Sequence, residues 1–211
     1  IGRDPAVATV CDSVEMIDIG RVGIWTPLLD QHPTGRIREL VGEIEAMGWP
    51  CLWRPESSGR DALVSAAHIL DATTTLRVAT GIAQIHARHP HTTAAAQKTL
   101  HEASGGRFLL GLGVSHAPFI EGSRKLPYRT PYTDMIEYLA AMREAPFNAC
   151  AADDEPPTVL AALGPKMLRL AATETQGAHP YFSPVEHTSL ARQIIGPNAL
   201  LAPEQMAVVD N

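Results

Sequence analysis

The sequence has few cysteines and no cluster of basic residues, and each shortage excludes a class of protein. Cys11, Cys51 and Cys150 are odd in number and widely spaced, which fits neither a disulfide framework nor a zinc site. We therefore expect a reducing, cytoplasmic location. The 17 Lys and Arg residues are outnumbered by 23 Asp and Glu residues, which gives a formal net charge of -6. Without a basic patch to neutralise phosphates, neither nucleic acid nor a membrane surface is expected as a partner.

The motifs of several other protein classes are absent as well. No apolar run is long enough to span a membrane, and residues 1–20 lack the basic and apolar segments of a signal peptide. There is no Gly-x-Gly-x-x-Gly before a helix and no Gly-x-Ser-x-Gly elbow, which argues against a Rossmann-type nicotinamide site and a hydrolase. His86, His89 and His91 lack nearby cysteines and a His-Glu-x-x-His pattern, so no metal site is predicted. Chemistry on a small molecule is the remaining expectation.

What the sequence does contain is a central β-α-β unit. Residues 76–82 and 107–113 are apolar runs without polar alternation, which is typical of strands buried on both faces. The Ala-rich segment between them is long enough for a helical crossover. We therefore predict parallel strands with a right-handed connection.

The same alternation of strand and helix extends along the chain. Further strands are predicted at residues 21–29, 51–54, 158–163 and 177–182, with one more within 199–209. Helices are predicted at residues 33–48, 62–71, 134–144 and 185–195, and from Pro165 onward. Residues 115–134 are predicted to be a long loop, and residues 1–20 show no clean period. This order predicts a single domain, residues 1–211, with the α/β fold of a (β/α)8 TIM barrel.

Glycines mark the ends of both central strands. Thr80 and Gly81 end the first strand, and Gly111 and Gly113 end the second. Ligands of parallel α/β folds bind at such carboxyl ends, where glycine lets a planar ligand approach the backbone. The alternative is that these glycines only shape the tight exits of the strands.

Two segments of this unit carry a resemblance to a known family. ATG at residues 79–81 with the following HP, and TL-x4-GGRFLLGLG at residues 99–113, resemble the bacterial luciferase-like superfamily of flavin- and deazaflavin-dependent oxidoreductases, most closely its actinobacterial coenzyme F420-dependent branch. The resemblance is strong over residues 21–184. It implies a luciferase-like barrel that is incomplete at the C-terminal end, because the family normally continues through further β/α units. It also implies a homodimer.

The resemblance further implies an oxidoreductase that transfers a hydride between coenzyme F420, an 8-hydroxy-5-deazaflavin, and a small organic substrate. Two alternatives stay open. One is an FMN-dependent monooxygenase of the same fold, and the other is a non-catalytic flavin-binding or interaction protein with a shortened barrel.

The positions for the ring and for catalysis follow from the same resemblance. Thr80 and Gly81 match a bulge with a non-prolyl cis peptide, against which the cofactor ring lies. Glu56 matches an acidic position, although Ser57 stands where histidine usually follows; the alternative is a solvated loop carboxylate. His116 stands in the place of a proton-donating carboxylate in sugar-phosphate-oxidising relatives. Histidine ordinarily titrates near pH 6.5, which suits a general acid or base, although a structural loop histidine is the alternative.

The phosphorylated tail of the cofactor is expected at the loops after the fifth and sixth predicted strands. Leu163 and Gly164 precede a helix whose first N–H groups can face an anion. The resemblance places four further residues along the cofactor side chain: His179, Pro180, Tyr181 and Phe182. Tyr181 and Phe182 could instead be barrel packing. Because His116 replaces a carboxylate, an anionic or carbonyl-bearing substrate is expected in place of a sugar phosphate.

Overall fold

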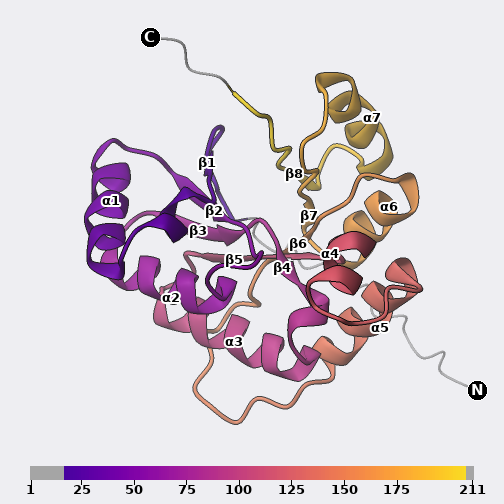
Figure 1. Ribbon diagram of the computed structural model, residues 1–211, viewed down its shortest axis with the longest axis horizontal. Helices are drawn as coiled ribbons and strands as arrows, with labels where there is room; N and C mark the ends of the chain where they lie inside the picture. The colour runs from indigo at the N-terminus through magenta and orange to yellow at the C-terminus, as the bar shows by residue number, and fades with distance from the viewer. Residues whose placement is uncertain (1–16, 208–211) are drawn as a thin grey trace, which may run out of the picture.

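The computed structural model describes residues 17–207, which form one curled parallel sheet surrounded by helices (Figure 1). The strands run in the order β1-β2-β3-β5-β6-β7-β8, β4 pairs with β5, and every pairing is parallel. Their bounds are β1 Ile24–Trp25, β2 Cys51–Arg54, β3 Arg77–Thr80, β4 Ala83–Gln84, β5 Phe108–Gly113, β6 Thr158–Leu160, β7 Gly177–Ala178 and β8 Leu200–Leu201. Within residues 17–207, β1 and β8 do not pair with each other. The prediction of an incomplete luciferase-like barrel is therefore confirmed.

Helices alternate with the strands and pack on one another around the outside of the sheet. Their bounds are α1 Thr34–Ala46, α2 Ala62–Ala72, α3 Pro90–Ala103, α4 Ala117–Gly122, α5 Pro131–Arg143, α6 Pro165–Glu174 and α7 Val185–Ile195, with 3-10 turns η1 Leu28–Gln31 and η2 Ile85–Ala87. Helix α1 packs on α2, α2 on α3, α3 on α5, α5 on α6 and α6 on α7. Figure 1 shows this row of helices following the curl of the sheet from α1 to α7. All loops at the strands' carboxyl ends therefore open on the same side of the barrel.

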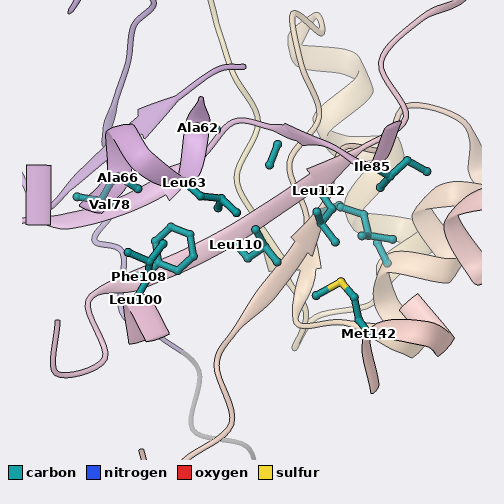
Figure 2. Close-up of a cluster of buried hydrophobic side chains, with 14 of the residues drawn as sticks. Ala62, Leu63, Ala66, Val78, Ile85, Leu100, Phe108, Leu110, Leu112 and Met142 are labelled. Carbon is teal, nitrogen blue, oxygen red and sulfur yellow. The ribbon is translucent and has the colours of Figure 1, made fainter. Parts of the chain in front are cut away.

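Strand β5 shows how the core is divided between the two faces of the sheet. All six residues of β5 are buried. Phe108, Leu110 and Leu112 belong to the large cluster between the sheet and the helices, and Figure 2 shows them with Leu100 of α3. Leu109 belongs to a smaller cluster on the other face of the sheet. The strand is thus buried on both faces, as its unbroken apolar run predicts.

The structure shortens several predicted strands, including the one predicted at residues 76–82, which is β3 at Arg77–Thr80. β1 covers only Ile24–Trp25 of the predicted residues 21–29, because Pro27 has no N–H for the ladder and the chain turns into η1. β6 ends at Leu160 and β7 at Ala178, each a few residues before a proline. The strand expected within residues 199–209 is β8, which is only two residues long.

Two further differences concern the loop predicted at residues 115–134 and the chain ends. This loop contains α4, which has Pro118 in its first turn, where a missing N–H breaks no helical hydrogen bond. Helix α5 begins at Pro131 for the same reason, ahead of the predicted residue 134. Residues 1–16, most of the predicted irregular lead-in, lie outside the described residues. Among residues 17–207, no helix is both long enough and apolar enough to cross a membrane.

Candidate functional site

A cavity of about 640 Å³ lies at the carboxyl ends of the strands. Its lining residues end a strand or follow one: Trp25 ends β1 and Pro27 follows it; Pro55, Glu56 and Ser57 follow β2; Gly81 and Ile82 follow β3; Gln84 ends β4; Val114, Ser115 and His116 follow β5; Ala161, Ala162, Leu163 and Met167 follow β6; His179 and Tyr181 follow β7. Parallel α/β barrels bind their ligands at this end. The volume is in the usual range for a small-molecule site.

The turn between β3 and β4 forms one wall of the cavity. The peptide bond between Gly81 and Ile82 is cis, which is one bond later than the predicted pair Thr80 and Gly81. The turn is held by Trp25, whose Nε1 donates to the Gly81 carbonyl oxygen at 2.8 Å, and by Gly81 N, which donates to Arg54 O at 2.8 Å. A Cβ on Gly81 would lie 2.8 Å from Trp25 Nε1, so glycine is required there.

Thr80 does not face the cavity, contrary to its predicted role in binding the ring. Its side chain is fully buried, and its Oγ1 donates to Gly111 O at 2.7 Å and accepts from Gly111 N at 2.8 Å. A Cβ on Gly111 would overlap the Thr80 carbonyl oxygen, and one on Gly113 would lie 2.6 Å from Ile82. Both glycines of β5 therefore permit close packing of the β3–β4 turn against this strand, a role that differs from the tight strand exit considered from the sequence.

Glu56 lines the cavity, but its carboxylate is already occupied by donors. Its Oε2 accepts from Gln84 N at 2.7 Å and from Arg88 Nη1 at 3.0 Å, and its Oε1 accepts from Arg88 Nη2. Arg88 also pairs with Asp61 at 2.5 Å, the N-cap of α2. Burial works against the charge on Arg88, but the bonds to Glu56 and Asp61 outweigh it and raise the pKa of Arg88. The alternative of a solvated loop carboxylate is wrong, because Glu56 is buried.

His179 lies directly after β7 and is only 3% exposed. Its ring stacks on Trp53 with a centroid distance of 4.4 Å, and its Nδ1 lies 2.6 Å from Ala202 O. Burial lowers the pKa of His179 to about 4, against a smaller raising effect of the bond to Ala202, so the ring is neutral near pH 7. Within the described chain, the buried Nε2 has no hydrogen-bond partner.

His116 stands at the rim of the cavity, directly before α4. Its imidazole is exposed and does not cap the helix, while its main-chain oxygen accepts from Phe119 N at 3.1 Å. The segment that follows is tied across the cavity by Arg124, which donates to Gln84 Oε1 at 3.3 Å and to Ser57 O at 3.1 Å. His116 is therefore an exposed residue held at the edge of the cavity.

Only some of the residues predicted to bind the cofactor tail line the cavity. Leu163 and Tyr181 line the cavity and are half-exposed, whereas Gly164 is the N-cap of α6 outside the lining. Pro180 is buried outside the lining, and Phe182 is 60% exposed. Packing inside the barrel does not explain Tyr181 and Phe182, since 48% of Tyr181 and 60% of Phe182 are exposed.

Sequence reasoning missed Trp25, Gln84 and Met167 as lining residues. Trp25 and Gln84 each end a strand of only two residues, so periodicity gave little signal for them. Their position at the carboxyl ends was the signal that could have found them. Among residues 17–207, no group of three or more His, Cys, Asp or Glu side chains is arranged to hold a metal ion.

Comparison with known proteins identifies the family. The model of the family described as luciferase-like monooxygenase matches residues 21–196. A Mycobacterium tuberculosis protein provisionally named a coenzyme F420-dependent oxidoreductase is 32% identical over 124 residues, which cover 59% of this chain and 35% of that protein. An uncharacterized Mycobacterium bovis protein is 33% identical over 108 residues, covering 51% of this chain and 32% of that protein. The chain thus aligns with about a third of the length of these curated relatives.

Solved structures share the fold. The coenzyme F420-dependent tetrahydromethanopterin reductase from Methanopyrus kandleri has a TM-score of 0.68 at 20% identity, covering 83% of this chain and 60% of that chain. The FMN complex of the oxygenating constituent of 3,6-diketocamphane monooxygenase from Pseudomonas putida has a TM-score of 0.63 at 13% identity, covering 82% and 61%. At such identities these structures show the fold alone. The match of the family model over residues 21–196 shows that this chain belongs to the luciferase-like monooxygenase family.

Proposed function

We propose that the cavity binds a deazaflavin or flavin ring, with coenzyme F420 as the first candidate, and that the chain is an oxidoreductase acting on a small organic substrate. The observation that carries this proposal is the cavity wall at Gly81 and Ile82, beside the unpartnered Nε2 of His179. A residue larger than glycine at position 81 would collide with Trp25 and His179 and so disturb this wall. When bound, the ring would supply hydride transfer, which protein side chains cannot perform.

The lining suits a flat heterocycle. Most of it is apolar, including Trp25, Ile82, Val114 and Met167. Apolar walls exclude water from a bound ring and strengthen the electrostatic interactions made there. Leu163 and Tyr181 at the open side are placed to contact the part of the cofactor that extends toward solvent. Gly164 and the N-terminus of α6 remain the proposed neighbours of a phosphate in that tail.

The charges around the cavity leave the substrate class open. No Lys or Arg is among the lining residues of the described chain, and Glu56 is neutralised by Arg88. Arg124, however, donates to the lining residues Gln84 and Ser57 and so brings a cation to the edge of the cavity, and both the anionic and the carbonyl-bearing substrate remain candidates. His116, exposed at the rim, is the proposed group that gives or takes the proton at the substrate oxygen. Glu56 then acts as a positioning residue, because its oxygens hold Gln84 and Arg88.

An FMN-dependent monooxygenase is the second candidate. It is favoured by the description of the family model and by the FMN complex among the solved structures. A non-catalytic flavin-binding or interaction protein is the third candidate, and it would bind the ring without turnover.

Turnover distinguishes these candidates. The purified protein is incubated without oxygen with oxidised F420 and a panel of small secondary alcohols, and with reduced F420 and the matching ketones. We expect loss or gain of deazaflavin absorbance with at least one pair. Formation of an oxygenated product from the substrate panel with reduced FMN in air, and none of the F420 reactions, would favour the monooxygenase. Ring binding without either reaction would favour the non-catalytic protein.

A further inference from the structure

The protonation of His179 is determined by its surroundings. Nδ1 lies 2.6 Å from the carbonyl oxygen of Ala202, which can only accept a hydrogen bond, so Nδ1 carries the proton. The pKa of about 4 keeps the second nitrogen unprotonated near pH 7. Nε2 is therefore a lone-pair acceptor. The stacking on Trp53 at 4.4 Å and 18° keeps the ring in this orientation.

This acceptor has no donor in the described part of the protein. Nε2 is buried, yet it makes no hydrogen bond, which is uncommon for a buried polar atom. The nearby indole N–H of Trp25 already donates a hydrogen bond to Gly81 O at 2.8 Å, so it does not serve Nε2. Nε2 lies 3.0 Å from the position that a Cβ on Gly81 would occupy, beside the wall of the cavity. A molecule bound against this wall is the source that we consider for the missing donor.

We propose that His179 Nε2 accepts a hydrogen bond from the imide N–H of the bound ring, the N3–H between its two carbonyl groups. This inference rests on the proposed function. Oxidised flavins and deazaflavins share this ring N–H, so His179 does not choose between F420 and FMN. It orients the ring by placing the imide edge toward β7, and it rejects rings in which this nitrogen is alkylated.

The first test compares ligands that differ only at N3. FMN and 3-methyl-FMN, and 8-hydroxy-5-deazariboflavin and its 3-methyl derivative, are titrated into the wild-type protein and the His179→Phe variant. Phe keeps an aromatic ring for Trp53 but has no acceptor, and it is no smaller than His, so it creates no new space for the methyl group. His68→Phe, on the exposed side of α2, is the matched control.

We expect the wild-type protein and the control to bind the unmethylated ligand at least tenfold more tightly than its methyl derivative. In His179→Phe, this ratio should fall to about threefold or less, through weaker binding of the unmethylated ligand. An unchanged ratio in His179→Phe would overturn the inference while leaving the proposed function intact. If neither ligand pair binds the wild-type protein, the proposed function fails with it.

A second measurement needs no variant and therefore does not depend on folding of His179→Phe. In the protein labelled with ¹⁵N-histidine, the His179 Nε2 resonance should move toward lower frequency when the unmethylated ligand binds, as expected for an acceptor that gains a donor. The 3-methyl ligand should leave it in place. If the resonance does not respond to the bound unmethylated ligand, Nε2 is satisfied by water and the inference is wrong.

Discussion

At the scale of single residues, the polar side chains of the cavity differ in how many of their atoms already have partners. Both oxygens of Glu56 accept hydrogen bonds, and one of the two ring nitrogens of His179 is bound to Ala202. His116 is exposed at the rim. Proton transfer requires a group whose atoms can reach a substrate, so His116 is the candidate for this step, and Glu56 and His179 organise the site.

Replacement of His116 with Ala should lower turnover about a hundredfold or more, the usual effect of losing a general acid or base. Binding of F420 should change little, because the exposed ring does not support the cavity wall. The measurement is kcat with the identified substrate, beside an equilibrium titration of the cofactor. His91→Ala, exposed on α3, is the control. Normal turnover of His116→Ala would show that His116 is not the general acid or base.

Replacement of Glu56 with Ala should lower the free energy of unfolding by about 3 kcal/mol, because it leaves the partly buried guanidinium of Arg88 without its main partner. Urea denaturation measures the change. Glu39→Ala, which breaks an exposed ion pair to Arg36, should have a much smaller effect because solvent screens that pair. If the two substitutions lower the free energy of unfolding equally, the ion pair of Glu56 and Arg88 contributes no more to stability than an exposed pair, which would contradict this account.

Stability should fall as the pH is lowered from about 6.5 to about 4, the ordinary and the lowered pKa of His179. In this window the unfolded chain binds a proton that the folded chain does not, so acid favours unfolding, by on the order of 3 kcal/mol in total. Glu45 does not add to the pH dependence in most of this window. Burial raises its pKa, but the backbone hydrogen bonds from Thr75, Leu76 and Thr74 outweigh burial and lower the pKa to about 2, so Glu45 loses its contribution to the free energy of unfolding only below about pH 4.5. Denaturation of His179→Phe between pH 6.5 and 4.5 should show a smaller pH dependence than the wild type. Identical slopes would contradict the buried, neutral histidine.

At the scale of elements, the packing of β5 against the β3–β4 turn places the wall of the cavity. Gly111→Ala should destabilise the protein by about 3 kcal/mol or more, because its Cβ would overlap the Thr80 carbonyl oxygen in a fully buried place. Gly42→Ala, in α1 with open space around it, should instead add up to about 1 kcal/mol. Urea midpoints of the two variants test this contrast, and a stable Gly111→Ala would contradict the close approach.

Periodicity predicted the longer elements well and the shortest ones poorly. The strand at Cys51–Arg54 and the helix at Val185–Ile195 were predicted with their observed bounds. The two-residue strand β4 has no period to detect, and prolines near α4 gave the pattern of a loop. The pairing of Glu56 with Arg88 joins residues from separate loops and depends on the assembled barrel, so local pattern could not reveal it.

At the scale of the whole molecule, the curled sheet brings the carboxyl ends of separate strands to one cavity. The order of strands and helices was sufficient to predict this, because parallel strands with short outer crossovers place all these ends on one side. Which side chains fill the cavity depended on where each short strand stopped. The homodimer, the cytoplasmic location and the single domain stay predictions.

The central claim is that this cavity binds a deazaflavin or flavin ring. Its most direct test is an equilibrium titration of the purified protein with F420 and, separately, with FMN, followed by the fluorescence of the ligand. We predict saturable binding of F420 at one site per chain, at least tenfold tighter than binding of FMN, with both weakened by substitution of Gly81 with Val, which would place a side chain against Trp25 and His179. Tighter binding of FMN would select the flavin alternative, and saturable binding of neither would contradict the claim.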